Sequence, residues 1–491
     1  MQTYKRSDAL AYLPVLAILL LPTIGLVTFA TTDQLIRLFP DDAFYYLQTA
    51  FNAVHLGRIS FDGLSETNGF HPLQFLVSVL LAKISDKSAL LRWVVIENAF
   101  LVLVTSVVLV GYFFRDCTRV ARILAIVVLS SPIWYLYIWL DAGMEMGPVL
   151  LFGALFYCAW DAAADNAFIS LRENCWFAAC AALLILARLD VSIPLALFAL
   201  VYLAFAIRKR LSVRYIVIPA VVAAMLLLPY VAWNWSKFGH LVPVSGVVKA
   251  GAAHDVKSNW RALSSGSHIG GVLVVLPLLS AVAALWLRAV PQRLRSSFWL
   301  LIASTGIYYA YVLFYAQQVF RWYLAYPLVL QSVSIALLLR ELLRAEKLVS
   351  AFCNFRMVVG CVLLSAGLHT VLYIWASHVD TTSLYLKQVA EDLNLRLNRN
   401  DIVATYDAGI IGYFSTARVV NLDGLANSYE YYESYLKQNR VGAYLKEIDA
   451  TYYLAREEAG RDLPFESDNM VDLVASYRIP RQFDLSLYHI K

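Results

Sequence analysis

The chain has 491 residues, of which 60% are hydrophobic and only 15% are charged, and its formal net charge is +5. Together with a mean hydropathy of +0.62, this composition excludes an ordinary soluble globular protein and indicates a polytopic membrane protein. We therefore expect the lipid bilayer as a partner and no nucleic acid.

Apolar segments long enough to span a bilayer recur along most of the chain, and we predict about eleven transmembrane helices from them. The first segment follows Lys5 and Arg6. It is too long for a signal peptide and lacks a small-residue cleavage pattern, so we interpret it as a retained helix. The predicted spans are residues 9–29, 89–114, 122–140, 148–163, 174–189, 192–207, 215–235, 270–289, 297–316, 323–340 and 356–376.

The short apolar run at residues 71–84 decides the predicted topology, because counting it as a span would invert every later loop. If this run lies along the membrane surface instead, most Arg and Lys clusters fall on the side of the N-terminus, as the positive-inside rule requires. We therefore expect an inner (plasma) membrane protein with a cytoplasmic N-terminus. The first loop, residues 31–87, and the C-terminal region would then face the periplasm or the cell exterior.

The first loop opens with an amphipathic helix that carries two adjacent acids, Asp41 and Asp42, in its first turn. One carboxylate is enough to cap a helix and to complement its dipole. The second is then available to face a cavity, and an acid so close to a membrane suggests function. The periodicity that predicts this helix and its end comes from Phe44, Leu47, Phe51, Val54 and Gly57.

The same loop continues with the string FDGLSETNGFHPL, which contains turn signals at Asp62-Gly63 and Asn68-Gly69. Pro72 suits the first turn of another short helix. Turn and helix chemistry explain the glycines and the proline, but they leave Asn68 and His71 unexplained. For these two residues, contact with a substrate and a purely structural role both stay open.

The C-terminal region has ordinary polar content, and its patterns predict a small α/β domain. An amphipathic helix is expected at residues 386–397, followed by strands at 401–407, 418–424, 450–456 and 473–479. Asp407 and Asp423 each follow a predicted strand, at the edge where α/β sheets commonly bind ligands. They either face an acceptor or form turns.

We therefore predict a transmembrane module at residues 1–376, which includes the catalytic loop 31–87, and an extracytoplasmic α/β domain at 377–491. Several strings in this order resemble the GT-C superfamily of membrane glycosyltransferases. They are DDAFYY, TNGFHPL, AGMEM, LARLD, NWSKFGHLVPVSGVVK, FRWYLAYP and NLDGL.

This resemblance implies an inverting enzyme that moves a sugar from a polyprenyl-phosphate carrier to an acceptor on the outer face, a glycan or a protein. It also implies that an acid of the first loop is the catalytic base, and Asp41 matches the first acid of the family's pair. Within the superfamily the chain looks similar to bacterial arabinofuranosyltransferases of the cell envelope, which suggests a pentose such as arabinofuranose.

The residues lead to a similar chemistry by themselves. Soluble nucleotide sugars are made in the cytosol, so an outward-facing site needs a donor carried by a lipid. Transfer requires a base, for which we choose Asp41 first and Asp42 second, and cations that stabilise the departing phosphate. For the phosphate we nominate Arg321 in a short turn and Lys249 in a long loop. A snorkelling anchor or a solvated loop is the alternative for each.

Glu145 lies in a very short turn between two predicted spans with no cation near it in sequence. It is a candidate for binding a sugar, and Asp423 is a candidate for binding the acceptor. A divalent cation such as Mg²⁺ or Mn²⁺ is an open option, with Asp42 and Glu145 as its oxygen ligands. An exposed acid without a special role is the alternative for Glu145.

Two other functions remain in competition with the glycosyltransferase. A transporter or flippase of a lipid-linked saccharide would show polar or broken spans at mid-depth, often in related halves. The acids of this chain gather at the ends of the spans, which favours the enzyme. A non-catalytic scaffold would leave the first-loop string unexplained.

Overall fold

The computed structural model describes residues 13–131, 138, 141–251, 255–264, 270–316, 319–344, 355–379, 382–457, 464, 470–479 and 483–491. Residue contacts divide the chain into two compact units, which are described separately. The bundle unit comprises Met1–Ala30, Val95–Pro229 and Ala253–Trp375. The loop–tail unit comprises Thr31–Val94, Tyr230–Ala252 and Ala376–Lys491.

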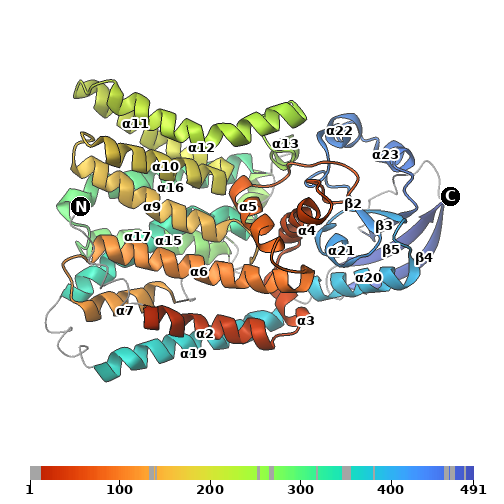
Figure 1. Ribbon diagram of the computed structural model, residues 1–491, viewed down its shortest axis with the longest axis horizontal. Helices are drawn as coiled ribbons and strands as arrows, with labels where there is room; N and C mark the ends of the chain where they lie inside the picture. The colour runs from red at the N-terminus through yellow and green to blue at the C-terminus, as the bar shows by residue number, and fades with distance from the viewer. Residues whose placement is uncertain are drawn as a thin grey trace. The chain divides into compact units, whose positions relative to one another are not determined.

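The bundle unit consists of helices that lie side by side along their length (Figure 1). Short 3-10 turns η2 (Leu189–Val191), η3 (Gln292–Leu294) and η4 (Arg321–Ala325) lead into three of them. The helices that lie wholly or partly in this unit are α2 (Leu13–Phe29), α6 (Lys87–Phe113), α7 (Arg119–Leu129), α9 (Met146–Asp165), α10 (Leu171–Ala187), α11 (Ser192–Arg208), α12 (Arg214–Phe238), α14 (Val256–Ser264), α15 (Gly270–Trp286), α16 (Arg295–Tyr315), α17 (Pro327–Arg344) and α19 (Phe355–Val379).

Among the described residues, six helical segments are long and apolar enough to cross a membrane, and four shorter apolar helices accompany them. The segments at Met146–Asp165 and Arg321–Arg344 are largely buried, whereas little of Arg214–Phe238 is buried. An apolar helix with an exposed surface is what a lipid-facing position requires. Part of the predicted span at 122–140 lies outside the described residues, as do Lys5 and Arg6.

The loop–tail unit joins the first loop to the C-terminal region. Its first-loop elements are α3 (Thr32–Leu35), η1 (Ile36–Leu38), α4 (Asp41–His55) and α5 (Pro72–Ala82), and α13 (Val244–Gly251) comes from the middle of the chain. The tail contributes α20 (Thr382–Arg396), α21 (Gly409–Phe414), α22 (Tyr429–Tyr431), the π-helical turn η5 (Tyr432–Leu436) and α23 (Val441–Glu447).

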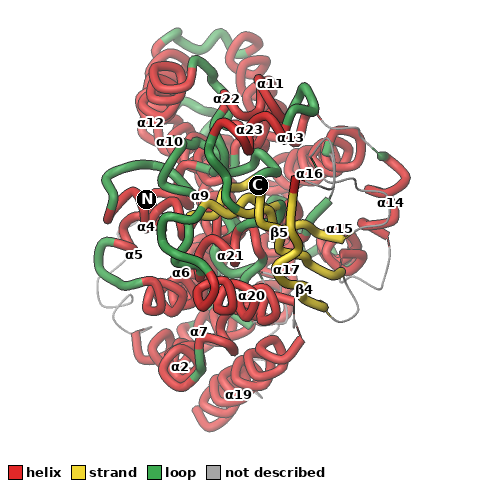
Figure 2. The backbone as a smooth tube through the Cα atoms, turned by 90° about the vertical axis from the view of Figure 1, so that its right-hand side faces the viewer, coloured by secondary structure: helices red, strands yellow, loops and turns green. Residues whose placement is uncertain are grey.

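The tail contains one five-stranded sheet with the order β2-β1-β3-β5-β4, which Figure 2 shows in yellow. β1 pairs in parallel with β2 and β3, whereas β5 pairs antiparallel with β3 and β4. The strands are β1 (Ile402–Thr405), β2 (Arg418–Asn421), β3 (Tyr452–Glu457), β4 (Val471–Ile479) and β5 (Phe483–Ile490). The α/β character of the tail is confirmed, and β5 is a strand that we did not predict.

The predicted helices of the first loop are present. α4 ends at His55, shortly before Gly57, as its periodicity indicated. α5 has 11 residues, so it is about 16 Å long. A span needs roughly 30 Å, and this length therefore agrees with a helix that does not cross the membrane.

The first loop and the tail pack closely within the loop–tail unit, where α4 contacts α21 and α21 contacts α20 (Figure 1). A Cβ atom added to Gly69 would lie 1.8 Å from the carbonyl oxygen of Leu425. One added to Gly409 would lie 2.1 Å from the carbonyl oxygen of Asp41. No side chain fits at these distances, so glycine permits the contact between backbones.

Candidate active site

Asp41 lies in the first turn of α4, but it does not cap that helix, whose N-cap residue is Pro40 and has no side-chain hydrogen bond. Its carboxylate instead accepts two backbone hydrogen bonds at the start of α21. The N–H of Gly409 donates to Oδ2 at 3.0 Å, and the N–H of Ile410 donates to Oδ1 at 2.7 Å. Asp41 therefore caps α21, although it belongs to a distant segment of the chain, because it accepts the first N–H groups of that helix.

The surroundings of Asp41 favour its protonated form. Burial of the carboxyl group raises its pKa most, and the negative charges of Asp407 and Asp42 raise it further. The two N–H donors act in the opposite direction, yet the pKa stays well above its usual value. A carboxylate with a raised pKa and a fixed orientation has the properties of a general base.

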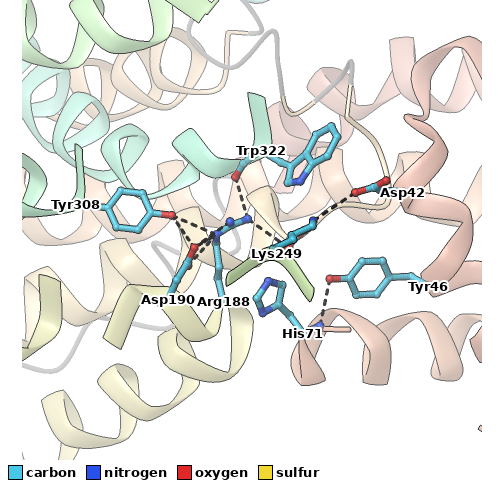
Figure 3. A network of polar contacts seen from close by, with 9 residues as sticks. Asp42, Tyr46, His71, Arg188, Asp190, Lys249, Tyr308 and Trp322 are labelled. Carbon is cyan, nitrogen blue, oxygen red and sulfur yellow. Dashed lines mark hydrogen bonds and ion pairs between the residues drawn. The ribbon is translucent and has the colours of Figure 1, made fainter. Parts of the chain in front are cut away.

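Asp42 faces a cation. Its Oδ2 lies 3.7 Å from Nζ of Lys249 on α13, and both side chains are about one quarter exposed, as Figure 3 shows. The pair thus joins two residues that the sequence suggested independently, one as an acid and one as a phosphate ligand. Both remain accessible to a partner.

Tyr45 lies one helical turn after Asp41 and connects α4 to the ends of β1 and β2. Its hydroxyl donates to Oδ2 of Asp423 at 3.3 Å. It accepts from Nδ2 of Asn421 at 2.9 Å and from the N–H of Ala408 at 3.1 Å. Tyr45 is only 6% exposed, so these contacts form inside the loop–tail unit.

Asp423 lies within this network and contacts the first loop through Tyr45, and its contact with an acceptor stays a prediction. Its Oδ2 also accepts from the N–H of Asp407 at 2.8 Å and from Asn421 at 3.0 Å. Burial, followed by the charge of Asp407, raises the pKa of Asp423 to about 6. Asp407 itself has a positive φ of 48° and pairs with Arg456 at 2.7 Å.

Asn68 and His71 both lie in this unit. Asn68 is fully buried, its Nδ2 donates to Oδ1 of Asn234 at 3.1 Å, and its Oδ1 accepts from the N–H of Val244 at 3.0 Å. The N–H of His71 donates to the hydroxyl of Tyr46 at 3.1 Å (Figure 3). This geometry favours the structural alternative for Asn68, and substrate contact by His71 stays a prediction.

The bundle unit has a separate polar cluster around Arg188, which is only 2% exposed. Its guanidinium lies 2.9 Å from Asp190 Oδ1 and 3.4 Å from Glu145 Oε1. It also donates to the hydroxyl of Tyr308 and to the carbonyl of Trp322 (Figure 3). Arg188 thus pairs with Asp190, two positions away in the sequence, and it is the cation that Glu145 lacked in its sequence neighbourhood.

Arg321, the first choice for the donor phosphate, pairs with Asp141. Its Nη2 lies 2.8 Å from Asp141 Oδ1, and Arg321 is 37% exposed while Asp141 is fully buried. Burial raises the pKa of Asp141 to about 6, and the charge of Arg321 limits this rise. Arg321 is thus held from one side by a carboxylate and is accessible on the other.

The predicted metal ligands Asp42 and Glu145 each lie beside a cation. Across the described ranges, no group of three or more His, Cys, Asp and Glu side chains is placed to hold a metal ion. Asp42 faces Lys249 and Glu145 faces Arg188, so each acid is already compensated by a cation. The divalent cation therefore stays a prediction, and no step below depends on one.

The sequence reasoning missed Tyr45, Asn421 and Asp141. Tyr45 is one of 30 tyrosines, and nothing in its local pattern separates it from a core residue. Asn421 ends a strand next to the predicted Asp423, so its position at the edge of the sheet was a usable signal.

Comparisons with known proteins agree with this architecture. The family model that matches is a domain of unknown function (DUF8728), at residues 375–488. No curated protein matches the sequence. The structure resembles apo ArnT from Cupriavidus metallidurans, with a TM-score of 0.57 and 13% identity over 95% of this chain and 97% of that one.

Two further solved structures show the same fold. ArnT from Cupriavidus metallidurans bound to undecaprenyl phosphate matches with a TM-score of 0.54 and 11% identity, over 95% and 97% of the two chains. The archaeal oligosaccharyltransferase AglB from Archaeoglobus fulgidus, in complex with an inhibitory peptide and a dolichol-phosphate, matches with a TM-score of 0.53 and 12% identity, over 91% of this chain and 69% of that one. These matches confirm the GT-C fold, a polytopic helical membrane protein with a small C-terminal α/β domain.

Proposed function

We propose that this protein is an inverting glycosyltransferase that moves a sugar from a polyprenyl-phosphate carrier to an acceptor hydroxyl. The observation that carries the proposal is the arrangement at the start of α4. There Asp41 is held by two backbone N–H groups, and its neighbour Asp42 pairs with the accessible cation Lys249. Two solved structures of the same fold contain a polyprenyl-type phosphate, undecaprenyl phosphate in ArnT and dolichol-phosphate in AglB.

In the proposed step, the acceptor oxygen forms a bond to the anomeric carbon from the side opposite the phosphate. The bond between that carbon and the phosphate oxygen breaks, and its electron pair leaves with the lipid phosphate. Asp41 takes the acceptor proton, since each of its oxygens accepts one N–H and has a second lone pair.

Lys249 supplies positive charge to the departing phosphate in this proposal. Phosphate oxygens compete with Asp42 for the ammonium group, and Asp42 holds that group in place when no donor is bound. Arg321 of the bundle unit stays a proposed phosphate ligand, because its guanidinium is partly exposed and its planar fork suits an oxyanion.

The finer assignments rest on the resemblance of the sequence. We propose a pentose such as arabinofuranose as the sugar, and a glycan or a protein of the cell envelope as the acceptor. We also propose that the loop–tail unit faces away from the cytoplasm, in the inner (plasma) membrane. Cysteine labelling at residue 42 and at an exposed residue of the tail would test this orientation.

The function is tested with purified protein, a panel of polyprenyl-phosphate sugars and matching nucleotide sugars, followed by mass analysis of the products. We expect transfer from a lipid-linked donor alone and a loss of at least about 100-fold in Asp41→Asn. Because Asp41 also caps α21, Gly409→Ala is the matched control, which disturbs the same contact and keeps the carboxylate. Transfer from nucleotide sugars only would refute the proposal, and full turnover in Asp41→Asn would remove Asp41 as the base.

A further inference from the structure

Asp41 and Tyr45 act on the same short stretch of the tail. The two residues are separated by four positions, so they project from one face of α4. Asp41 accepts the N–H groups of Gly409 and Ile410, and Tyr45 accepts the N–H of Ala408. One turn of α4 therefore holds the first backbone amides of α21 in sequence.

The hydroxyl of Tyr45 uses its full hydrogen-bonding capacity. A phenol has one donor and two acceptor lone pairs, and here the donor meets Asp423 while the lone pairs meet Asn421 and Ala408. Asn421 ends β2, Asp423 follows it, and Ala408 precedes α21. Loss of this single oxygen would remove three hydrogen bonds at once and would leave the buried N–H of Ala408 without its acceptor, which is more costly than loss of one surface hydrogen bond.

We propose that Tyr45 is a positioning residue of the transferase site, and that through it the tail holds Asp41 in its orientation toward the acceptor. This inference rests on the proposed function. The tail is then part of the catalytic apparatus, because the base takes its orientation from α21 and the ends of β1 and β2. Tyr45 acts through Asp41 and does not itself touch the reacting atoms.

The charged groups around this contact come from several elements. Asp42 belongs to α4, Asp407 follows β1, and Asp423 follows β2. Two of these acids have a cation beside them, because Lys249 pairs with Asp42 and Arg456 pairs with Asp407. If Asp41 moves among these charges, both its pKa and the orientation of its carboxylate change. The pH profile of turnover therefore reports on the position of Asp41.

Tyr45→Phe is the primary test, and Tyr413→Phe is the matched control. Tyr413 is a buried tyrosine of α21, and its hydroxyl also connects the tail to the first-loop side, through the carbonyl of Lys87. We expect kcat to fall roughly tenfold in Tyr45→Phe, with the KM for the polyprenyl-phosphate donor within about twofold of wild type. The acid limb of the pH profile should move to higher pH, because the N–H donors that favour the ionised carboxylate become less well aligned.

Hydrogen exchange gives a second measurement that does not depend on activity. The amides of Ala408, Gly409 and Ile410 should exchange at least about tenfold faster in Tyr45→Phe, and Tyr413→Phe should leave them near the wild-type rate. Asn421→Ser removes one donor from the same hydroxyl and should give a smaller change in the same direction, which covers the case that Tyr45→Phe does not fold.

Equal losses in Tyr45→Phe and Tyr413→Phe, with an acid limb that stays in place or moves to lower pH, would overturn the inference while leaving the function intact. A wild-type protein that transfers no sugar from any lipid-linked donor would overturn the function itself. The exchange rates at residues 408–410 would still show whether Tyr45 holds this segment.

Discussion

The backbone N–H of Ile410 donates to Oδ1 of Asp41 at 2.7 Å, across a separation of 369 positions in the sequence. The first acid of the Asp41–Asp42 pair is thus joined to a helix of the tail that begins within one residue of this contact. Asp41, the proposed base, therefore also has a structural role as the cap of α21. Experiments on Asp41 need to separate the catalytic role from the structural one.

Gly409→Ala should destabilise the loop–tail unit by about 1–3 kcal/mol. The added Cβ would lie 2.1 Å from the carbonyl oxygen of Asp41 and 2.8 Å from its carboxylate, so α4 and α21 must separate. Thermal unfolding and limited proteolysis in detergent would measure the change. Gly306→Ala is the control, because nothing lies within 4 Å of a Cβ at that helical position, and equal stability of the two variants would contradict the tight contact.

Lys249→Ala should raise the KM for the lipid-linked donor roughly tenfold, with a change in stability below about 1 kcal/mol. The reason is that Lys249 is a partly exposed ion-pair partner of Asp42 rather than a buried support. Lys237→Ala removes the same charge from the same unit, where Lys237 lies 3.7 Å from Glu66 with both side chains about half exposed. Similar KM values for the two variants would show that Lys249 is not a phosphate ligand.

Arg188→Met should reduce the stability of the bundle unit by about 3–5 kcal/mol. The substitution leaves Glu145 and Asp190 without the guanidinium that compensates them. Yield and unfolding temperature in detergent would report the loss. Arg344→Ala is the comparison, since its ion pair with Asp116 is more than 40% exposed on both sides and should contribute less than about 1 kcal/mol; an Arg188→Met protein as stable as Arg344→Ala would count against the network.

The stability of the loop–tail unit should fall as the pH rises from about 4 to about 6. Burial raises the pKa of Asp423 from 3.8 to about 6, so the folded state binds the proton more tightly than the unfolded state. The contribution is fully present below the unfolded pKa and is lost as the pH rises through the folded pKa. Its size is at most about 3 kcal/mol, at roughly 1.4 kcal/mol per pKa unit.

Asp423→Asn removes the titrating group and should flatten this part of the curve. Chemical unfolding at several pH values, with wild type and variant compared at each, would measure the slope. A variant whose slope matches wild type would mean that Asp423 does not carry this proton. Asp41, whose pKa is also raised by burial, contributes in the same direction and remains in both proteins.

The local part of the fold was predictable from the sequence, because periodicity and turn residues act over a few positions. The period of apolar residues placed α4, and short apolar runs placed four of the strands. β5 was missed although Phe483, Leu485 and Leu487 alternate with polar residues. The length and the alternation of this segment were adequate signals for a strand, but we did not use them.

The candidate site was predictable in its residue types and not in its contacts. Asp41 and Asp42 were found because paired acids beside a membrane are unusual. Their partners, Ile410 and Lys249, were not assignable, since each pair forms only after distant segments have packed. Arg188 and Asp190 differ in this respect, because they lie only two positions apart in the sequence.

The family model begins at residue 375, yet α21 of that region takes its cap from Asp41. A gene fusion that joins residues 375–488 to another membrane protein would keep the sheet and α21 but would lose the Asp41 carboxylate that caps α21. Chimeras between related proteins should therefore exchange the first loop and the tail together. The same contact predicts that natural recombination at this boundary succeeds only when the parent gene that supplies the first loop encodes an acid where α4 begins.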